Sequence, residues 1–215
     1  MFTPAQNPNF SPMKIFCVGR NYVDHAKELN NPMPQQPVVF TKPPTAVIRN
    51  GQDFYLPDFS KNVHYEGELV VRIGKNGKNI AEKFAGKYID AITFGIDFTA
   101  RDLQDYLKEN KLPWDLAKGF DGSAALGDWL PIESVGDIHD INFRTLLNGQ
   151  EVQHGNSNLM IFPFEKMIAF VSSYFTLQIG DLIYTGTPAG VGAVAAGDVL
   201  EGYIGDRKLL KTVVR

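Results

Sequence analysis

The chain has 215 residues, a formal net charge of −3, 44% hydrophobic residues and 21% charged residues, a composition typical of a globular protein. It contains no basic block, so we expect neither a nucleic-acid-binding nor a membrane-binding surface. No apolar run is long enough to span a membrane, and the N-terminus lacks the basic flank and apolar core of a signal peptide, so we expect a cytoplasmic location.

Short strands dominate the predicted elements of the first half of the chain. Residues 1–13, rich in Pro and Asn, predict an irregular N-terminal arm, and we expect a single domain over residues 14–215. Asn30-Asn31-Pro32 ends the first helical pattern and opens a proline-rich loop. The apolar patterns predict strands at 14–18, 38–40, 64–73 and 91–97, and helices at 20–29 and from the N-cap Thr99 to a stop at Pro113.

The second half contains a hairpin, one helix and further strands. Residues 141–153 predict a hairpin that turns at Asn148-Gly149. Apolar residues at helical spacing predict a helix over 164–175. Strands are predicted at 181–185, 198–204 and 208–214.

The stretch 64–71, His-Tyr-Glu-Gly-Glu-Leu-Val-Val, carries the strongest chemical signal. Side chains on a strand alternate between faces, so His64, Glu66 and Glu68 should share one face and Leu69 the other. Two buried carboxylates side by side are costly unless a cation compensates them. A hard divalent ion with oxygen ligands fits this requirement.

Asp97 ends the next strong strand and can complete a group of three carboxylates with Glu66 and Glu68. Such a group suits Mg²⁺ or Mn²⁺, whereas the Cys and His spacing of a zinc site is absent. A solvated strand face remains the alternative interpretation of the Glu-x-Glu pair.

Three further segments can carry chemistry. His25 and Glu28 stand three apart on a predicted helix, where a carboxylate can orient an imidazole to deprotonate water; an exposed polar helix face is the alternative. Lys118 lies between apolar neighbours and can stabilise an oxyanion, or it can be a surface lysine. The Gly-rich segment 185–192 can present hydroxyl groups to a ligand or form a structural turn.

Taken together, these motifs resemble the fumarylacetoacetate hydrolase superfamily, in particular its single-domain acylpyruvase and oxaloacetate decarboxylase-like branch. They run in family order along nearly the whole chain. The matching segments are Gly19-Arg20-Asn21-Tyr22 with Asp24-His25 and Glu28, Phe40-Thr41-Lys42-Pro43 with Thr45-Ala46, His64-Tyr65-Glu66-Gly67-Glu68-Leu69, Asp97-Phe98-Thr99-Ala100-Arg101-Asp102-Leu103-Gln104, Leu112-Pro113-Trp114 with Ala117-Lys118, and Thr185-Gly186-Thr187-Pro188 with Gly190-Val191-Gly192.

The resemblance implies a strand-rich α+β fold, a mixed β-sheet rolled on itself with a few short helices, and a homodimer. It also implies one Mg²⁺ or Mn²⁺ per chain, held by Glu66, Glu68 and Asp97. His25 and Glu28 would lie on a lid helix, with Lys118 beside the developing enolate. Further residues would surround a small 2-oxo acid, namely Arg20, Arg101, Gln104 and Thr187.

The implied activity is metal-dependent hydrolysis of a C–C bond in acylpyruvate-type β-dicarbonyl acids, with oxaloacetate decarboxylation on the same site. In this hypothesis His25, oriented by Glu28, activates the water, and Lys118 stabilises the pyruvate enolate. An isomerase or tautomerase acting on 2-hydroxy-dienoates or the enol of oxaloacetate is the alternative. A non-catalytic metal- or ligand-binding protein is a third interpretation.

Overall fold

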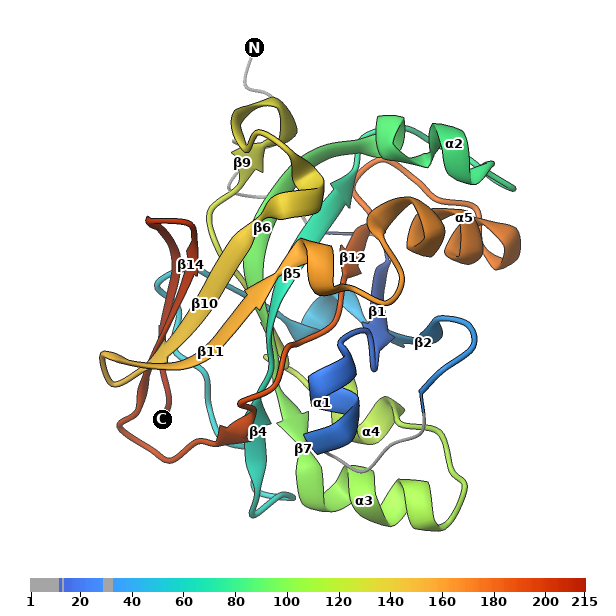
Figure 1. Cartoon of the computed structure of the whole chain (residues 1–215). Helices are drawn as coiled ribbons and strands as arrows, with labels where there is room; N and C mark the ends of the chain where they lie inside the picture. The colour runs from blue at the N-terminus through green and yellow to red at the C-terminus, as the bar shows by residue number, and fades with distance from the viewer. Residues whose placement is uncertain (1–11, 13, 29–32) are drawn as a thin grey trace.

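The protein's structure, a computed structural model, describes residues 12, 14–28 and 33–215, and its main element is a curled, mixed sheet of eight strands (Figure 1). The strand order is β2-β1-β12-β5-β6-β8-β3, and β9 pairs with β6. β1 runs parallel to β12 and β3 to β8, while β5 and β6 are antiparallel. The strands are β1 (Ile15–Gly19), β2 (Val38–Lys42), β3 (Val47–Arg49), β5 (Gly67–Ile73), β6 (Ile89–Asp97), β8 (Ala124–Leu126), β9 (Leu130–Pro131) and β12 (Leu182–Tyr184).

Two smaller sheets complete the strand-rich fold. The four-stranded sheet has the order β11-β10-β14-β15, and the three-stranded sheet has the order β13-β4-β7. The predicted hairpin is confirmed as β10 and β11, and its turn residues Asn148 and Gly149 have φ of 52° and 81°. The strands are β10 (Asn142–Leu147), β11 (Gln150–Asn156), β14 (Val199–Ile204), β15 (Arg207–Val213), β4 (Val63–Tyr65), β7 (Thr99–Ala100) and β13 (Gly192–Ala193).

Short helices lie at two ends of the sheets: α2 and α5 at one, and α1, α3 and α4 at the other (Figure 1). Their bounds are α1 (Val23–Glu28), α2 (Glu82–Ala85), α3 (Arg101–Glu109), α4 (Asp115–Lys118) and α5 (Phe164–Tyr174). The predicted helix over 164–175 is therefore confirmed. The predicted helix stop at 30–32 and most of the predicted arm, 1–11 and 13, lie outside the described residues. Within the described chain, none of the helices has the length and apolarity needed to cross a membrane.

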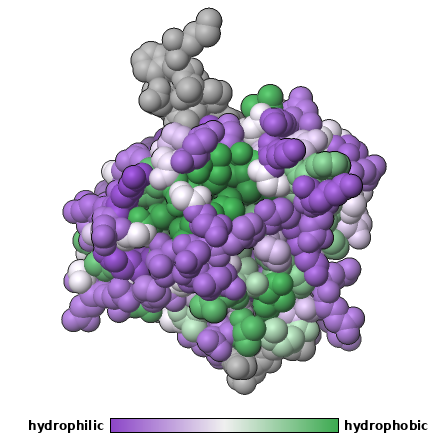
Figure 2. Space-filling view, turned by 45° about the horizontal axis from the view of Figure 1, so that its top comes forward, coloured by the Kyte–Doolittle hydropathy of each residue, from purple (hydrophilic) through white to green (hydrophobic). Residues whose placement is uncertain are grey.

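The large sheet is buried on both faces, which explains its nearly continuous apolar strands. Phe16 of β1 and Leu69 of β5 pack into the larger hydrophobic cluster, whereas Cys17 and Val70, their sequence neighbours, pack into a smaller cluster on the opposite face. Hydrophilic residues cover most of the molecular face seen in Figure 2, with apolar patches between them.

The structure corrects the prediction of one continuous strand over 64–73. The chain forms β4 and β5 in two different sheets, with Glu66 at the break between them. The residue after the break is glycine, Gly67, because a Cβ atom at this position would lie 2.1 Å from Oγ1 of Thr145. The break separates His64 from the two glutamates: its Nε2 lies 3.0 Å from Oδ1 of Asn62, outside the acidic cluster.

The assignment of Thr99 as a helix N-cap is wrong. Thr99 belongs to β7, and Ala100 precedes α3 with no side-chain cap. Oγ1 of Thr99 lies 2.6 Å from the ammonium group of Lys118. A buried ammonium group needs oxygen partners. The hydroxyl of Thr99 therefore serves as a partner for Lys118 and not as a helix cap.

Candidate active site

Three carboxylates meet where β5 and β6 lie side by side. One ligand atom from each of Glu66, Glu68 and Asp97 lies within 4.8 Å of the others. The backbone sets this arrangement: Glu68 pairs with Gly95 across the strands, and the amide of Asp97 donates to the carbonyl of Glu66. All three residues are buried, so the solvated strand face, the alternative interpretation of the Glu-x-Glu pair, is wrong.

Two cations compensate part of this negative charge. Nζ of Lys118 lies 2.7 Å from Oε2 of Glu66 and 2.7 Å from Oδ2 of Asp97. The guanidinium of Arg101 donates to the other oxygen of Glu66. Burial alone would raise the pKa of Glu66, but Lys118 and Arg101 outweigh it and hold this pKa well below its usual value. Lys118 is only 3% exposed, so it is not a surface lysine.

A third cation, Lys42, also contacts the cluster. The sequence predicted no role for it. Its Nζ forms a 2.7 Å ion pair with Oδ1 of Asp97. It also donates to the hydroxyl and the carbonyl of Ser123 and to the carbonyl of Lys118. Lys42 belongs to the Thr-Lys-Pro segment that carried the family resemblance, and this was the available signal.

Glu68 is the carboxylate whose charge is least compensated. It accepts a 2.7 Å hydrogen bond from the amide of Gly186, and no ion pair links it to a cation among the described residues. Burial and the charges of Asp97 and Glu66 raise its pKa well above the usual value. A buried, oxygen-only donor set with excess negative charge at Glu68 fits a hard divalent ion such as Mg²⁺ or Mn²⁺.

The His25–Glu28 pair lies on α1, beside these carboxylates. Nδ1 of His25 lies 3.2 Å from Oε2 of Glu28, whose other oxygen accepts a 3.0 Å hydrogen bond from the amide of Gly190. This arrangement assigns the proton to Nδ1 and leaves Nε2 as the basic nitrogen. Burial lowers the pKa of His25, which favours the neutral ring. The predicted alternative of an exposed helix face is wrong for His25, which is 5% exposed.

The segment 185–192 braces both parts of the site. The amide of Gly186 binds Glu68 and that of Gly190 binds Glu28. Both glycines have positive φ, and a Cβ atom at Gly190 would lie 2.2 Å from the carbonyl of Val152. The hydroxyl of Thr187 donates to the carbonyl of Gly67, so its proton is already engaged within the protein.

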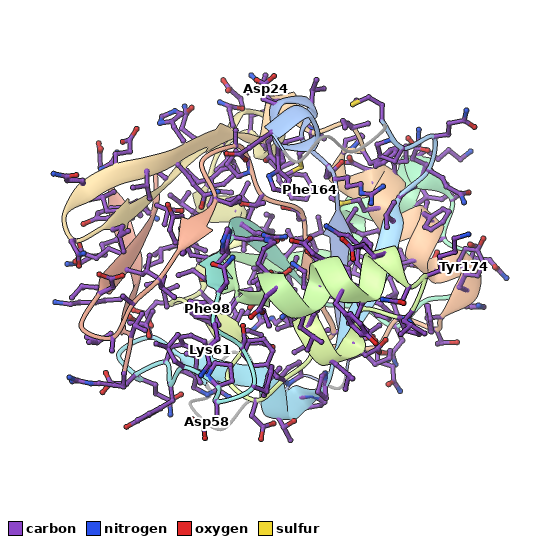
Figure 3. All side chains as sticks on the ribbon, turned by 90° about the horizontal axis from the view of Figure 1, so that it is seen from below. Asp24, Asp58, Lys61, Phe98, Phe164 and Tyr174 are labelled. Atoms are coloured by element: carbon purple, nitrogen blue, oxygen red, sulfur yellow. The ribbon has the colours of Figure 1, made fainter. Side chains whose placement is uncertain are left out.

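These residues surround one cleft of about 420 Å³, including the part open to solvent. It receives side chains from α1, α3 and α4, which lie on the same side of the sheets; Figure 3 shows α3 in green across the view from below and α1 beside the labelled Asp24. The predicted site residues that line it are His25, Lys118, Arg20, Arg101, Gln104, Thr187, Glu66, Glu68 and Asp97.

Among the predicted site residues, Glu28 does not line the cleft and contacts it through His25. Arg101 and Gln104 are bonded to one another, with Nη1 of the arginine 2.6 Å from Oε1 of the glutamine. The sequence prediction missed Phe40, Trp114 and Lys108, which also line the cleft. Phe40 and Trp114 lie in segments that carried the resemblance, whereas Lys108 gave no signal.

Comparisons with known proteins are consistent with this geometry. The family model for the C-terminal domain of fumarylacetoacetate (FAA) hydrolase matches residues 14–215. The mitochondrial oxaloacetate tautomerase of Caenorhabditis elegans is 41% identical over 90% of this chain and 91% of its own length. The mitochondrial oxaloacetate decarboxylase of Dictyostelium discoideum is 40% identical over 87% of each.

Among solved structures, the fumarylpyruvate hydrolase of Pseudomonas aeruginosa, in complex with Mn²⁺ and pyruvate, superposes with a TM-score of 0.90. It is 34% identical to this chain, and the match covers 97% of this chain and 92% of that one. The chain belongs to the fumarylacetoacetate hydrolase family.

Proposed function

We propose that the protein is a divalent-metal-dependent enzyme that interconverts the keto and enol forms of a short 2-oxo acid, with oxaloacetate as its substrate. The observation that carries this proposal is the placement of His25 in the same cleft as the buried cluster of Glu66, Glu68 and Asp97. The tautomerase activity in the name of the Caenorhabditis elegans relative supports the choice of reaction.

The cluster supplies the metal part of the proposal. One Mg²⁺ or Mn²⁺ per chain, held by Glu66, Glu68 and Asp97, would supply a Lewis acid for the carboxylate and the 2-oxo oxygen of the substrate. Lys118 and Arg101 bring positive charge to the same place. These cations stabilise the negative charge that builds on the 2-oxo oxygen as a proton leaves the neighbouring carbon.

His25 is the proposed acid and base. Its neutral ring takes a proton at Nε2 from C3 of the keto acid and returns it in the reverse direction. Glu28 holds Nδ1–H and stabilises the ring while it is charged. The bond from Gly190 to Glu28 fixes the carboxylate and, through it, the orientation of the imidazole.

Hydrolysis of the C–C bond of an acylpyruvate is the second candidate, and the His25–Glu28 pair favours it. A neutral imidazole backed by a carboxylate can take a proton from water as that water attacks the distal carbonyl. The bond between this carbonyl and C3 then breaks, leaving a carboxylic acid and the enolate of pyruvate. Decarboxylation of oxaloacetate would pass through the same enolate without an attacking water.

One experiment separates these reactions. We would follow the enol absorbance of oxaloacetate and of acetylpyruvate with Mg²⁺, with Mn²⁺ and with a chelator, and would assay pyruvate in each sample. Metal-dependent relaxation of oxaloacetate without pyruvate supports tautomerisation, and stoichiometric pyruvate from acetylpyruvate supports hydrolysis. Activity that survives the chelator, or no activity on either acid, contradicts the proposal.

Three sequence predictions belong to the same proposal. We propose that residues 14–215 act as one catalytic domain, that the protein is a cytoplasmic homodimer, and that it binds small acids rather than nucleic acid or membranes. Light scattering tests the dimer: a mass near that of one chain, 23.9 kDa, would contradict it.

A further inference from the structure

We propose that Arg20 and Lys108 form a subsite at the mouth of the cleft for the second acidic group of a dicarboxylic 2-oxo acid. The inference rests on the proposed function, because it assumes that the first carboxylate and the 2-oxo group lie at the acidic floor. It adds to that function a reason why the site would prefer dicarboxylic acids to monocarboxylic acids.

The charges within the cleft are divided between its floor and its mouth. Its floor holds Glu66, Glu68 and Asp97, and the cations there, Lys118 and Arg101, are bonded to these acids. Arg20 and Lys108 line the same cleft but make no ion pair with the floor. Their positive charge therefore remains for an anion that enters from solvent.

Carboxylates of the described chain neutralise little of the charge of these two cations. Nζ of Lys108 lies 3.4 Å from Oδ1 of Asp105, a side chain that is 57% exposed. No carboxylate of the described chain forms an ion pair with Arg20, whose guanidinium carbon lies 5.8 Å from the centre of the Trp114 ring. An exposed pair such as Lys108–Asp105 is weak, so it does not cancel the attraction for a ligand carboxylate.

The positive groups that line the cleft also act on one another. Burial lowers the pKa of Lys108, and the nearby guanidinium groups of Arg101 and Arg20 lower it further, against the opposing effect of Asp105. Like charges gathered in a concave site create a positive potential that attracts anions. An arginine fork and a lysine ammonium group are suitable partners for a carboxylate.

The backbone at Arg20 supports a requirement for this side chain. Arg20 has φ of 59°, in the left-handed region where glycine is favoured. Glycine would remove the strain but would also remove the cation from the cleft. Strained non-glycine residues cluster at ligand sites, which agrees with the role proposed for the guanidinium.

Calorimetric titration of the Mg²⁺-loaded protein tests the subsite. Oxaloacetate and 2-oxobutanoate have the same chain length and differ in whether a carboxylate or a methyl group stands at the far end. We expect the wild type to bind oxaloacetate more tightly. Since a hydrogen bond to a charged group is worth about 1.5–3 kcal/mol, this preference should fall roughly ten- to a hundredfold in Lys108→Met.

Two further variants make the test specific. Lys108→Arg keeps a cation at the mouth and should retain most of the preference. Lys111→Met removes the same charge three residues away, outside the cleft, and should keep the wild-type preference. The proposal is overturned if the wild type binds both acids equally, or if neither Lys108→Met nor Arg20→Met changes the ratio of dissociation constants.

Calorimetry also separates this inference from the proposed function. The ratio of dissociation constants and the rate of tautomerisation are separate readouts, so a strong preference for oxaloacetate in a protein that does not accelerate its tautomerisation would retain the subsite and reject the reaction. Metal-dependent tautomerisation with an unchanged binding ratio in Lys108→Met and in Arg20→Met would retain the reaction and reject the subsite.

Discussion

Lys42 touches neither solvent nor the open part of the cleft, so replacing it by methionine should affect the stability of the protein. We expect the loss of stability to be large. The side chain of Lys42 is 0% exposed, and its ion-pair partner Asp97 is 1% exposed. Methionine fills a similar volume but removes the charge that faces Oδ1 of Asp97. It also removes the donor that reaches the carbonyl and hydroxyl of Ser123.

The magnitude follows from the loss of one partner of a buried pair. Removing a single member of such a pair costs about 3–5 kcal/mol, because the remaining charge stays buried without compensation. Domains of this kind have unfolding free energies of about 5–15 kcal/mol, so the expected loss is a large share of the total. For a chain of this length, that loss corresponds to a fall in Tm of roughly 6–20 °C.

Urea denaturation of the metal-free protein, followed by circular dichroism, measures this loss. Lys208→Met is the matched control, because Lys208 pairs with Glu201 at 2.9 Å on the exposed surface. We expect no measurable change in the control. A loss below about 1 kcal/mol in Lys42→Met, within the range of an exposed ion pair, would refute the reasoning.

Three other predictions concern the site itself. His25→Ala should slow tautomerisation and hydrolysis about 10²- to 10⁴-fold but decarboxylation much less, and equal losses in product assays would contradict its role as a base. Gly67→Ala should lower the unfolding free energy by about 1–3 kcal/mol or more, because the new methyl group would meet Thr145 and Phe94; wild-type stability in urea would contradict this. The raised pKa of Glu68 means that the metal-free fold loses stability as pH rises through that pKa, so Glu68→Gln should stabilise the metal-free protein at neutral pH. Unchanged stability of this variant in pH-dependent thermal melts would contradict the prediction.

Metal binding should follow the same titration. Since the ion and the proton compete for Glu68, the affinity for Mg²⁺ should rise with pH through the folded pKa of this residue. Calorimetric titrations at several pH values measure this dependence, and an affinity independent of pH would contradict it.

Local patterns were sufficient for most elements of the fold. The hairpin at 148–149 and helix α5 follow from turn chemistry and helical spacing, and the structure confirms both. The break at Glu66 was missed because it depends on contacts distant in sequence: the space next to Gly67 is filled by Thr145 and Gln153 of another sheet. A run of strand-forming residues carries no signal for such a contact.

The same limit explains what was missed in the site. Period-two spacing placed Glu66 and Glu68 together, and the family resemblance supplied most of the other site residues. Lys42 and Lys108 were missed because their roles depend on what faces them in three dimensions: Asp97 for one, and the cation-rich mouth of the cleft for the other. For a lysine, burial and nearby charges decide the role, and the sequence shows neither.

The central claim is that Glu66, Glu68 and Asp97 hold one divalent ion. Titration with Mn²⁺, followed by electron paramagnetic resonance of the free ion, tests this claim most directly, on the wild type and on Glu68→Ala. The account predicts one tight site per chain in the wild type and its loss in the variant. Equal Mn²⁺ binding by both proteins, or none by the wild type, would contradict it.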